Sequence, residues 1–336
     1  MRVERRSPAP PNARKPATPL NCPHGTTDFS QSLESQPSTL NSSLRSPLYD
    51  IRAFKAAYAL AQLLPRPVTR KIADALAWWS LRTSPDLKKI ARENLAIATD
   101  LTGENLDALV LENVRNFSRT LADYFLCAGD NAAGANALLG KLEGWEHIAA
   151  ARERGRGIVL VTGHVGHWEL GGLTLASRGV PMTVVTLPEP SDALMRWRSA
   201  CRRRLGIGTI AVGPGHDFAF VEMFRALREN ACLAMLVDRP HPGTGVTVRQ
   251  FGRDTEFSTG PAMLAHHTGA AIIPAFVFQQ PDHRYRAIAC PPVEMATGPL
   301  RQTLQENVQR IASVFEVLIR AHPDQWFNYV PLFQAP

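Results

Sequence analysis

Apolar residues recur every three or four positions through residues 47–145, which is the period of amphipathic helices. Prolines interrupt this pattern at Pro65 and Pro67, where a helix is expected to end. The pattern predicts one helix that starts near residue 47 and ends before Pro65, and three more over 68–81, 87–98 and 106–126. This part of the chain is therefore predicted to be all-helical.

After residue 145 the pattern changes to short β-rich runs that alternate with helical stretches. The predicted strands cover residues 157–162, 182–187, 209–212, 232–237, 246–251, 271–278 and 285–290. The predicted helices between and after them cover residues 191–205, 216–229, 261–268 and 300–320. This alternation predicts an α/β fold with helices flanking a sheet, which is mixed because the last strands follow one another closely.

The first residues have a different composition, rich in Pro, Ser, Thr and Asn and almost without apolar periodicity. We therefore predict three parts. Residues 1–46 form a disordered tail, residues 47–145 a helical, membrane-associating region, and residues 146–336 an α/β catalytic domain.

The chain carries a net charge of +7 and has a pI near 9.4, which favours anionic partners such as phospholipid head groups, nucleic acid or an acidic carrier protein. A nucleic-acid-binding protein would concentrate its basic residues on one face with aromatic residues among them. The arginines here are scattered among apolar strands, so we expect no nucleic-acid partner. The five cysteines form no Cys-x-x-Cys motif and predict free thiols in a reducing compartment.

No run of about 18 apolar residues free of charge occurs, so we expect no spanning helix. The first residues also lack the apolar core of a secretory signal, and we expect a cytoplasmic, peripheral or monotopic protein. Trp78 and Trp79 lie between Lys71 and Arg82, as in a helix at a bilayer interface. An ordinary helix packed on its neighbour accounts for the tryptophans equally well.

Residues 161–172, VTGHVGHWELGG, lie where an apolar strand ends and a helix is expected to begin. His164 and Glu169 are five residues apart and can meet only if a turn intervenes, for which Gly163 and Gly166 supply the backbone freedom. The Glu169 carboxylate would then hold one ring nitrogen of His164. The other nitrogen would accept a proton from a substrate hydroxyl.

Three alternative roles for these residues compete with that of a base and its partner. The first is a purely structural role, because a His and a Glu near a glycine-rich turn are common. The second is a metal-dependent hydrolase that uses His164, His167 and Glu169, although no His-Glu-x-x-His motif and no cysteine ligand are at hand. The third is a serine hydrolase, for which no Gly-x-Ser-x-Gly motif is present.

The segment HVGHWELGG resembles the His-x4-Asp/Glu (HX4E) motif of glycerolipid acyltransferases, in the form found in the bacterial lipid A biosynthesis (lauroyl/myristoyl) acyltransferase family. That family also includes acyltransferases of phosphatidylinositol mannosides. The resemblance continues in order through MRWRSACRRRLG, LVDRP, QFGRDTEFSTG and HPDQWFNY, and covers about residues 48–333. An ordered series of this kind is far more specific than any one motif.

The resemblance implies a glycerolipid acyltransferase-like fold and an O-acyltransferase. The enzyme would move a fatty acyl group from an acyl-carrier-protein or coenzyme A thioester to a hydroxyl of a lipid or glycolipid, such as a lipid A precursor, at the cytoplasmic face of the bacterial inner membrane. His164 would be the general base and Glu169 its partner, with no metal and no cofactor. A catalytically inactive lipid-binding scaffold of the same fold stays an alternative.

The same resemblance implies four substrate-binding residues. Arg202 or Arg204 would bind an anionic group, Asp238 would shape the acceptor pocket, and Arg253 in the FGRD turn would bind substrate. A solvated helix face is the alternative for at least one residue of 202–204, and a strand-end cap is the alternative for Asp238.

The chain also departs from the family pattern near these residues. It has His167 where the family often has Asn, and Arg239 where it often has Gln. Its C-terminal segment, QWFNYVPLF, lacks the basic ending of many lipid A enzymes. These departures concern the surroundings of the base and the identity of the acceptor.

Overall fold

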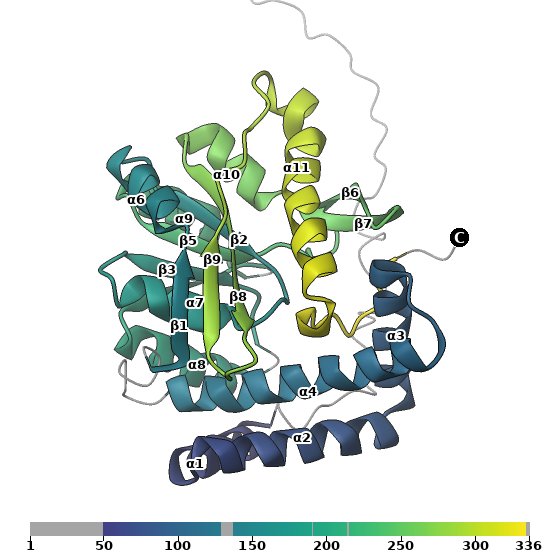
Figure 1. The fold of residues 1–336 in the computed structure, drawn as a ribbon. Helices are drawn as coiled ribbons and strands as arrows, with labels where there is room; N and C mark the ends of the chain where they lie inside the picture. Colours follow the sequence, from purple (N-terminus) through teal and green to yellow (C-terminus); the bar gives the residue numbers. More distant parts are fainter. Residues whose placement is uncertain (1–49, 129–136, 190, 214, 334–336) are drawn as a thin grey trace, which may run out of the picture. The chain divides into compact units, whose positions relative to one another are not determined.

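The computed structural model describes residues 50–128, 137–189, 191–213 and 215–333; the predicted tail, residues 1–46, lies outside them. The predicted α/β fold with a mixed sheet is confirmed: a seven-stranded sheet has helices on both faces (Figure 1). No helix within the described ranges is both long and apolar enough to cross a bilayer.

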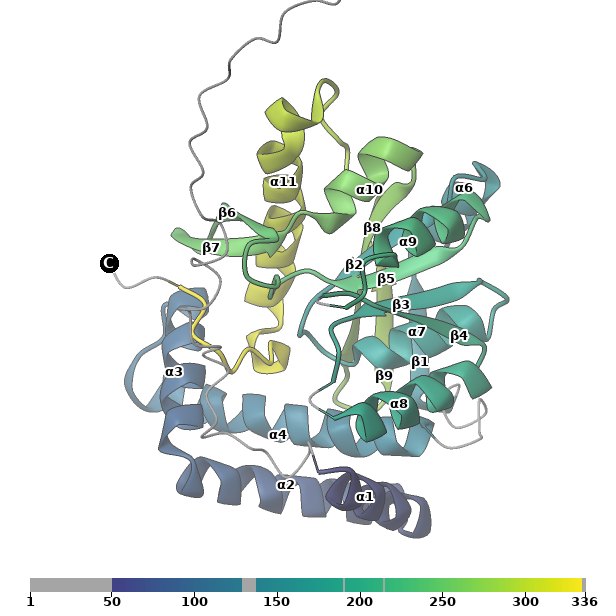
Figure 2. The same ribbon diagram turned by 180° about the vertical axis from the view of Figure 1, so that it is seen from behind.

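Four helices open the described chain, as predicted. They are α1 Ile51–Leu63, α2 Arg66–Thr83, α3 Pro85–Thr99 and α4 Gly103–Cys127. The side chain of Asp50 accepts a hydrogen bond from the N–H of Arg52 and caps α1. Pro67 lies in the first turn of α2, where a missing N–H costs nothing. In Figures 1 and 2, α4 crosses beneath the sheet and α2 packs beneath α4.

The large sheet has the strand order β1-β9-β8-β2-β5-β3-β4. Its strands are β1 Leu139–Glu143, β2 Ile158–Thr162, β3 Met182–Thr186, β4 Ile207–Ala211, β5 Cys232–Leu236, β8 Ala271–Gln279 and β9 Tyr285–Ala289. Strands β8, β2, β5, β3 and β4 are parallel, whereas β9 pairs antiparallel with β8 and parallel with β1. The carboxyl ends of the five parallel strands therefore meet at one edge, with β2 between β8 and β5.

Side chains of the central strands alternate between two apolar layers, so these strands are buried on both faces. Helices α9 Ala219–Arg228, α10 Gly260–Thr268 and α11 Leu300–Ala321 cover one face, and Figures 1 and 2 both show α10 beside α11. Helices α6 Trp145–Glu153, α7 Trp168–Ala176 and α8 Asp192–Arg204 lie on the other face. The sequence pattern did not predict α6 or the edge strand β1.

A separate hairpin, β6 Gly245–Gln250 and β7 Arg253–Ser258, packs on α11. Phe251 and Gly252 form its two-residue turn, with φ of 52° and 73°. Positive φ at both positions is typical of hairpin turns whose twist matches that of the strands. The turn expected at the FGRD segment is therefore present at residues 251–252, but Arg253 already begins strand β7, which the sequence pattern did not predict; the burial of Thr255 and Phe257 on either side of exposed Glu256 marks it as a strand.

A buried carboxylate joins the helical region to the sheet. Asp123 of α4 is fully buried and accepts hydrogen bonds from Arg66 Nε (2.7 Å), Arg70 Nη1 (3.1 Å) and the hydroxyl of Tyr285 in β9 (2.8 Å). Two positive charges and a phenol compensate the charge that burial would otherwise penalise. Helices α2 and α4 and strand β9 are thereby fixed to one another below the carboxyl edge of the sheet.

Candidate active site

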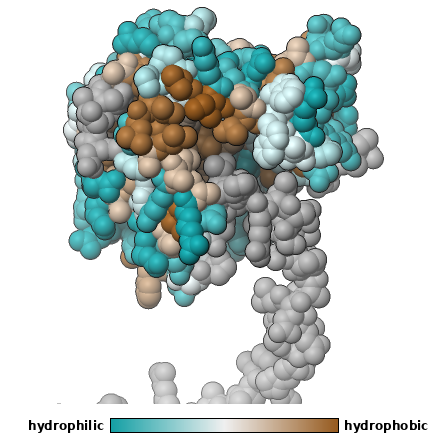
Figure 3. Space-filling model, turned by 90° about the horizontal axis from the view of Figure 1, so that it is seen from below, coloured by the Kyte–Doolittle hydropathy of each residue, from teal (hydrophilic) through white to brown (hydrophobic). Residues whose placement is uncertain are grey.

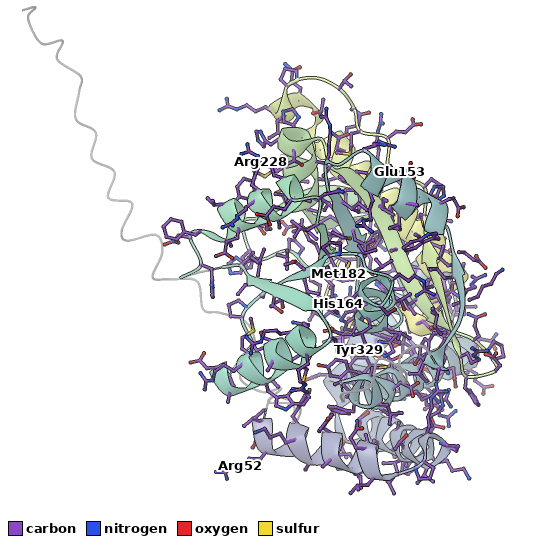
Figure 4. The ribbon with its side chains drawn as sticks, turned by 90° about the vertical axis from the view of Figure 1, so that its left-hand side faces the viewer. Arg52, Glu153, His164, Met182, Arg228 and Tyr329 are labelled. Carbon is purple, nitrogen blue, oxygen red and sulfur yellow. The ribbon has the colours of Figure 1, made fainter. Side chains whose placement is uncertain are left out.

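The turn between β2 and α7 is held by backbone hydrogen bonds to two distant segments. The N–H of His167 donates to the carbonyl oxygen of Val277 at the end of β8 (2.8 Å). The N–H of Gly166 donates to the carbonyl of Gln325 (2.8 Å), and the N–H of Phe327 donates to the carbonyl of His164 (2.7 Å). Figure 4 shows His164 well inside the outline of the molecule.

Two glycines shape this turn for different reasons. Gly166 has a φ of 59°, and a Cβ there would lie 2.0 Å from the carbonyl oxygen of Val277. A side chain at position 166 would therefore clash with β8 as well as strain the backbone. Gly163 is needed for space: a Cβ there would lie 2.9 Å from both Oδ2 of Asp238 and the ring of Phe315.

Asp238, just after β5, holds His164. Its Oδ1 lies 2.9 Å from Nδ1 of the imidazole, and its Oδ2 accepts the backbone N–H of His164 at 2.9 Å. β2 and β5 are neighbouring parallel strands, so their carboxyl ends bring the two residues together across 74 positions of sequence. The carboxylate fixes both the ring and the main chain of the candidate base.

The predicted pairing of His164 with Glu169 is wrong. Glu169 does lie in the first turn of α7, as expected, but its carboxylate accepts hydrogen bonds from Arg198 Nη2 (3.1 Å) and from Nε (3.3 Å) and Nη2 of Arg202. Because a turn and the start of α7 separate the two residues, the Glu169 carboxylate is directed toward α8 and not back to the imidazole of His164. Asp238 takes the place that the sequence spacing gave to Glu169.

Charge compensation keeps Glu169 ionised in this buried setting. Burial acts to raise the pKa of its carboxyl, but the positive charges of Arg202 and Arg198 outweigh that effect and lower the pKa to about 2. Arg198 also pairs with Glu189 (2.6 Å). Glu169 therefore stays negative at every pH at which a thioester substrate would be used.

The surroundings of His164 favour the neutral form of its imidazole. Burial lowers the pKa of its imidazole, the charge of Arg239 lowers it further, and Asp238 offsets only part of the shift. Burial raises the pKa of Asp238, but its interactions with His164 and the charge of Arg239 outweigh that effect, so the net shift is downward and the carboxylate is ionised. An ionised carboxylate can only accept, so Nδ1 of His164 carries the proton and Nε2 carries the lone pair.

A largely apolar cavity of about 200 Å³ lies between the sheet and α7, with His164 in its wall. Small side chains leave this space: Ala234, Ala275 and Ala289 on the sheet, and Gly171 and Gly172 on the helix. Its polar lining residues are Thr162, His164, Glu169, Thr174, Thr186, Arg198 and Arg202. The base and the Glu169 ion pairs therefore share one cavity.

Of the four predicted substrate-binding residues, two lie at the site and two lie away from it. Arg202 and Asp238 are buried at the site. Arg204 is directed to the end of α4, where it donates to the carbonyl of Ala128 (3.4 Å), and it does not line the cavity. Arg253 is exposed at the start of β7, also outside the cavity.

Two site residues were missed. Arg198 precedes Arg202 by one helical turn, and this spacing was a usable sign that both face the same way. Arg239 was noted only as a departure from the family pattern; its guanidinium donates to Oδ1 of Asn328 (2.6 Å) and to the carbonyl of Phe327 (2.7 Å). No sequence signal placed it beside His164.

The three residues of the alternative metal site suggested by the sequence each have a different partner in the structure. His164 faces Asp238, Glu169 faces two arginines, and Nδ1 of His167 accepts the N–H of Leu170 (3.3 Å) as the cap of α7. Burial lowers the pKa of His167 to about 4. Within the described part of the chain, no three His, Cys, Asp or Glu side chains are gathered so that they could hold a metal ion.

His164 is expected to titrate below its usual pKa of 6.5. Asp238→Asn should lower the pKa of His164 further, because the carboxylate is the group that favours the protonated ring. The measurement is an NMR titration of the histidine ring carbons, with the His164 signal identified by its loss in His164→Ala. A pKa above 6.5 in the wild type, or a rise in Asp238→Asn, would contradict this electrostatic description.

Glu169→Gln is expected to lower the free energy of unfolding by about 3 kcal/mol or more, because it leaves Arg198 and Arg202 buried with less compensation. Glu229→Gln is the matched control, because its pair with Arg225 is exposed and worth about 0–1 kcal/mol. Urea denaturation of both variants measures the difference. Equal losses would mean that the buried ion pairs do not stabilise the fold.

Comparison with known proteins shows the family to which the chain belongs. The family model for the bacterial lipid A biosynthesis acyltransferases matches residues 41–335. A phosphatidylinositol mannoside acyltransferase of Mycobacterium tuberculosis (strain CDC 1551 / Oshkosh) is 26% identical over 285 residues, which cover 84% of this chain and 88% of the relative. One from Mycolicibacterium smegmatis is 27% identical over 190 residues, or 56% of this chain and 61% of the relative. The chain, an O-acyltransferase acting in lipid synthesis, belongs to the bacterial lipid A biosynthesis acyltransferase family.

Proposed function

We propose that this acyltransferase moves a fatty acyl group from an acyl-carrier-protein or coenzyme A thioester to a hydroxyl of a glycolipid, with His164 as the base and Asp238 as its partner. The observation that carries the proposal is the bond between Nδ1 of His164 and Oδ1 of Asp238 (2.9 Å) at the wall of an apolar cavity. A base held in one tautomer beside a hydrocarbon-sized space suits an acyl transfer.

The proposed reaction needs one proton carrier. Nε2 of His164 takes the proton of the acceptor hydroxyl, and the oxygen forms a bond to the thioester carbonyl carbon. Asp238 stabilises the resulting imidazolium. The tetrahedral intermediate then collapses, the carbon–sulfur bond breaks, and the leaving thiolate takes the proton from Nε2. The product is an ester and a free thiol.

Two donors in the cavity wall are suited to the developing oxyanion. Nη1 of Arg202 and the hydroxyl of Thr162 are buried and make no hydrogen bond within the described structure. Glu169 fixes the rest of the Arg202 guanidinium. A fixed cation with one unused N–H, away from water, is effective where negative charge appears on a carbonyl oxygen. In this proposal Arg202 binds the oxyanion and Glu169 positions Arg202.

The acyl chain is proposed to lie in the cavity beneath α7. From His164, the lining runs along the sheet to Leu142 and Ile148 in one direction and to Ile207 in the other. The space for the chain therefore lies on the sheet itself, under α7.

The acceptor is proposed to be a glycolipid, in keeping with the names of the mycobacterial relatives. A second hollow, of about 270 Å³, lies on the other side of the pair His164 and Asp238. Asp238, Arg239 and Thr247 are among its lining residues, together with the C-terminal residues 330–332. Polar groups around an open hollow suit a hydroxylated head group, and its position next to Asp238 brings that head group close to the base.

Attachment to a membrane, at its cytoplasmic face, is proposed to occur through α1 and α2. Apolar side chains are exposed on these helices: Leu60, Leu63, Val68, Ile72, Leu76, Trp78 and Trp79. Figure 3 shows a hydrophobic patch on the underside of the molecule. Leu63 is 81% exposed and Trp79 59%. Exposed basic residues on the same helices, Lys55, Lys71 and Arg82, complement anionic head groups.

Transfer of labelled palmitoyl groups from acyl carrier protein and from coenzyme A to phosphatidylinositol mannosides and lipid A precursors tests the reaction. We expect a product with wild type and a loss of at least about 100-fold in kcat with His164→Ala, because the variant lacks the proposed base. Circular dichroism checks that the variant is folded. Equal product from wild type and variant would refute the base.

No product from the wild type on any acceptor, with retained binding of the lipids, would instead favour the lipid-binding scaffold. Arg253→Ala is a control for the assay, because Arg253 is exposed on the hairpin outside the cavity. Its kcat is expected to stay within about twofold of wild type.

Leu63→Ser combined with Trp79→Ser is expected to weaken binding to vesicles of 30% phosphatidylglycerol and 70% phosphatidylcholine by at least about tenfold, because the apolar contact is lost. Vesicle sedimentation measures the binding. The matched control is Val317→Ser, which removes an equally exposed apolar residue from α11. Wild-type binding by the double variant would show that these two helices do not meet the bilayer.

A further inference from the structure

The segment after α11 has a sequence motif, HPDQWFNY, that the proposed reaction does not use. It begins with a short 3₁₀ helix, Pro323–Gln325, and then continues without a regular helix or strand through residues 326–333. Trp326 and Phe327 are 2% exposed and anchor it in the core. In Figure 4 Tyr329, which belongs to this segment, is drawn below His164.

This segment pairs with the turn that carries the base. Val165 and Trp326 form an antiparallel bridge. The hydrogen bonds at its two ends, Gly166 to Gln325 (2.8 Å) and Phe327 to His164 (2.7 Å), are backbone bonds of the kind that join strands. The main chain of His164 therefore depends on where residues 325–327 lie.

The side chain of Gln325 fixes that place against the sheet. Its Oε1 accepts the backbone N–H of Gln279 (2.7 Å), and its Nε2 donates to the carbonyl of Gln279 (3.0 Å). The amide thus satisfies both backbone groups of the last residue of β8, as a neighbouring strand would. The carbonyl of Val277 in β8 also accepts the N–H of His167. Gln325 and the turn that carries His164 are therefore both hydrogen-bonded to the same strand, β8.

Asn113 of α4 fixes the same segment from the other side. It is fully buried, and its Nδ2 donates to the carbonyls of Pro323 (3.1 Å) and Trp326 (2.9 Å). Its Oδ1 accepts the hydroxyl of Tyr329 (2.9 Å). Every hydrogen-bonding group of this amide is used within the segment, so its geometry leaves the segment little freedom.

We propose that Gln325 and Asn113 are positioning residues that set the place of His164 through the backbone of residues 325–327. The inference rests on the proposed role of His164 as the base. Neither side chain lines the cavity, so neither touches substrate there. Their amides hold the segment between α4 and β8, and the segment in turn holds the carbonyl of His164 and the N–H of Gly166.

A shift of the turn moves Nε2 relative to the acceptor hydroxyl but leaves the cavity lining in place. Misplacement of a reacting group by about 1 Å can cost about 100-fold in rate. Gln325→Ala and Asn113→Ala are therefore expected to lower kcat by about 10- to 100-fold while KM for the acyl donor stays within about threefold. Gln325→Glu keeps one of the two hydrogen bonds to Gln279 and is expected to lie between wild type and Gln325→Ala.

The test combines this kinetic split with hydrogen–deuterium exchange of peptides spanning residues 162–170, using the full chain. Exchange in the turn is expected to speed up in both alanine variants, and this readout needs no acyl transfer. If the wild type transfers no acyl group, the proposed function fails, while faster exchange still supports the positioning role.

The matched control is Asn94→Ala. Asn94 is also a buried asparagine on a neighbouring helix, and its Nδ2 donates to two carbonyls of the same segment, Asn328 (2.8 Å) and Val330 (2.9 Å), farther from the turn. It should lose comparable stability on heating but keep kcat and exchange of residues 162–170 near wild type. Equal losses of kcat in all three variants, or unchanged exchange in Gln325→Ala and Asn113→Ala, would overturn the proposal.

Discussion

The position of His164 depends on backbone hydrogen bonds made by a turn that belongs to no regular element. A turn at a buried sheet edge must find partners for its N–H and C=O groups elsewhere. Here a carbonyl of β8 accepts a hydrogen bond from the N–H of His167, and residues 325–327 pair with residues 164–166 through backbone hydrogen bonds. The carboxylate of Asp238 accepts the N–H of His164. The three attachments come from distant parts of the chain, so the position of His164 depends on the assembled sheet and on the C-terminal segment.

The buried carboxylates near this turn have two kinds of partner: arginines, which keep their charge, and the imidazole of His164, which can change its charge. Glu169 is held by two arginines and has a pKa of about 2, and Asp123 is likewise held by two arginines and a phenol. Asp238 faces an imidazole instead. An arginine cannot lose its proton near neutral pH, whereas an imidazole can gain one. Of these buried carboxylates, Asp238 is therefore the one whose partner, His164, can change its charge near neutral pH.

The sequence predicted the mixed α/β fold, the four N-terminal helices and the turn with His164, because each depends on local periodicity or on glycines. It missed β1, whose residues alternate too weakly, and β7, whose charged residues look like a turn. It could not find the partner of His164, since the strand order that places β5 beside β2 is a property of the assembled sheet. Spacing along the chain made Glu169 the nearest candidate, but Asp238 is 74 positions away.

The five-residue spacing from His164 to Glu169 serves a different purpose from the one that spacing alone suggests. The turn brings His164 to Asp238, and the first turn of α7 directs Glu169 to Arg198 and Arg202 of α8. Helix α8 is thereby drawn over the sheet, where these two arginines complete the polar end of the cavity. One short motif therefore contributes His164 to the lining of the cavity and anchors two arginines of the same lining. The carboxylate at position 169 acts on the two arginines of α8, whereas the carboxylate at position 238 acts on the imidazole of His164.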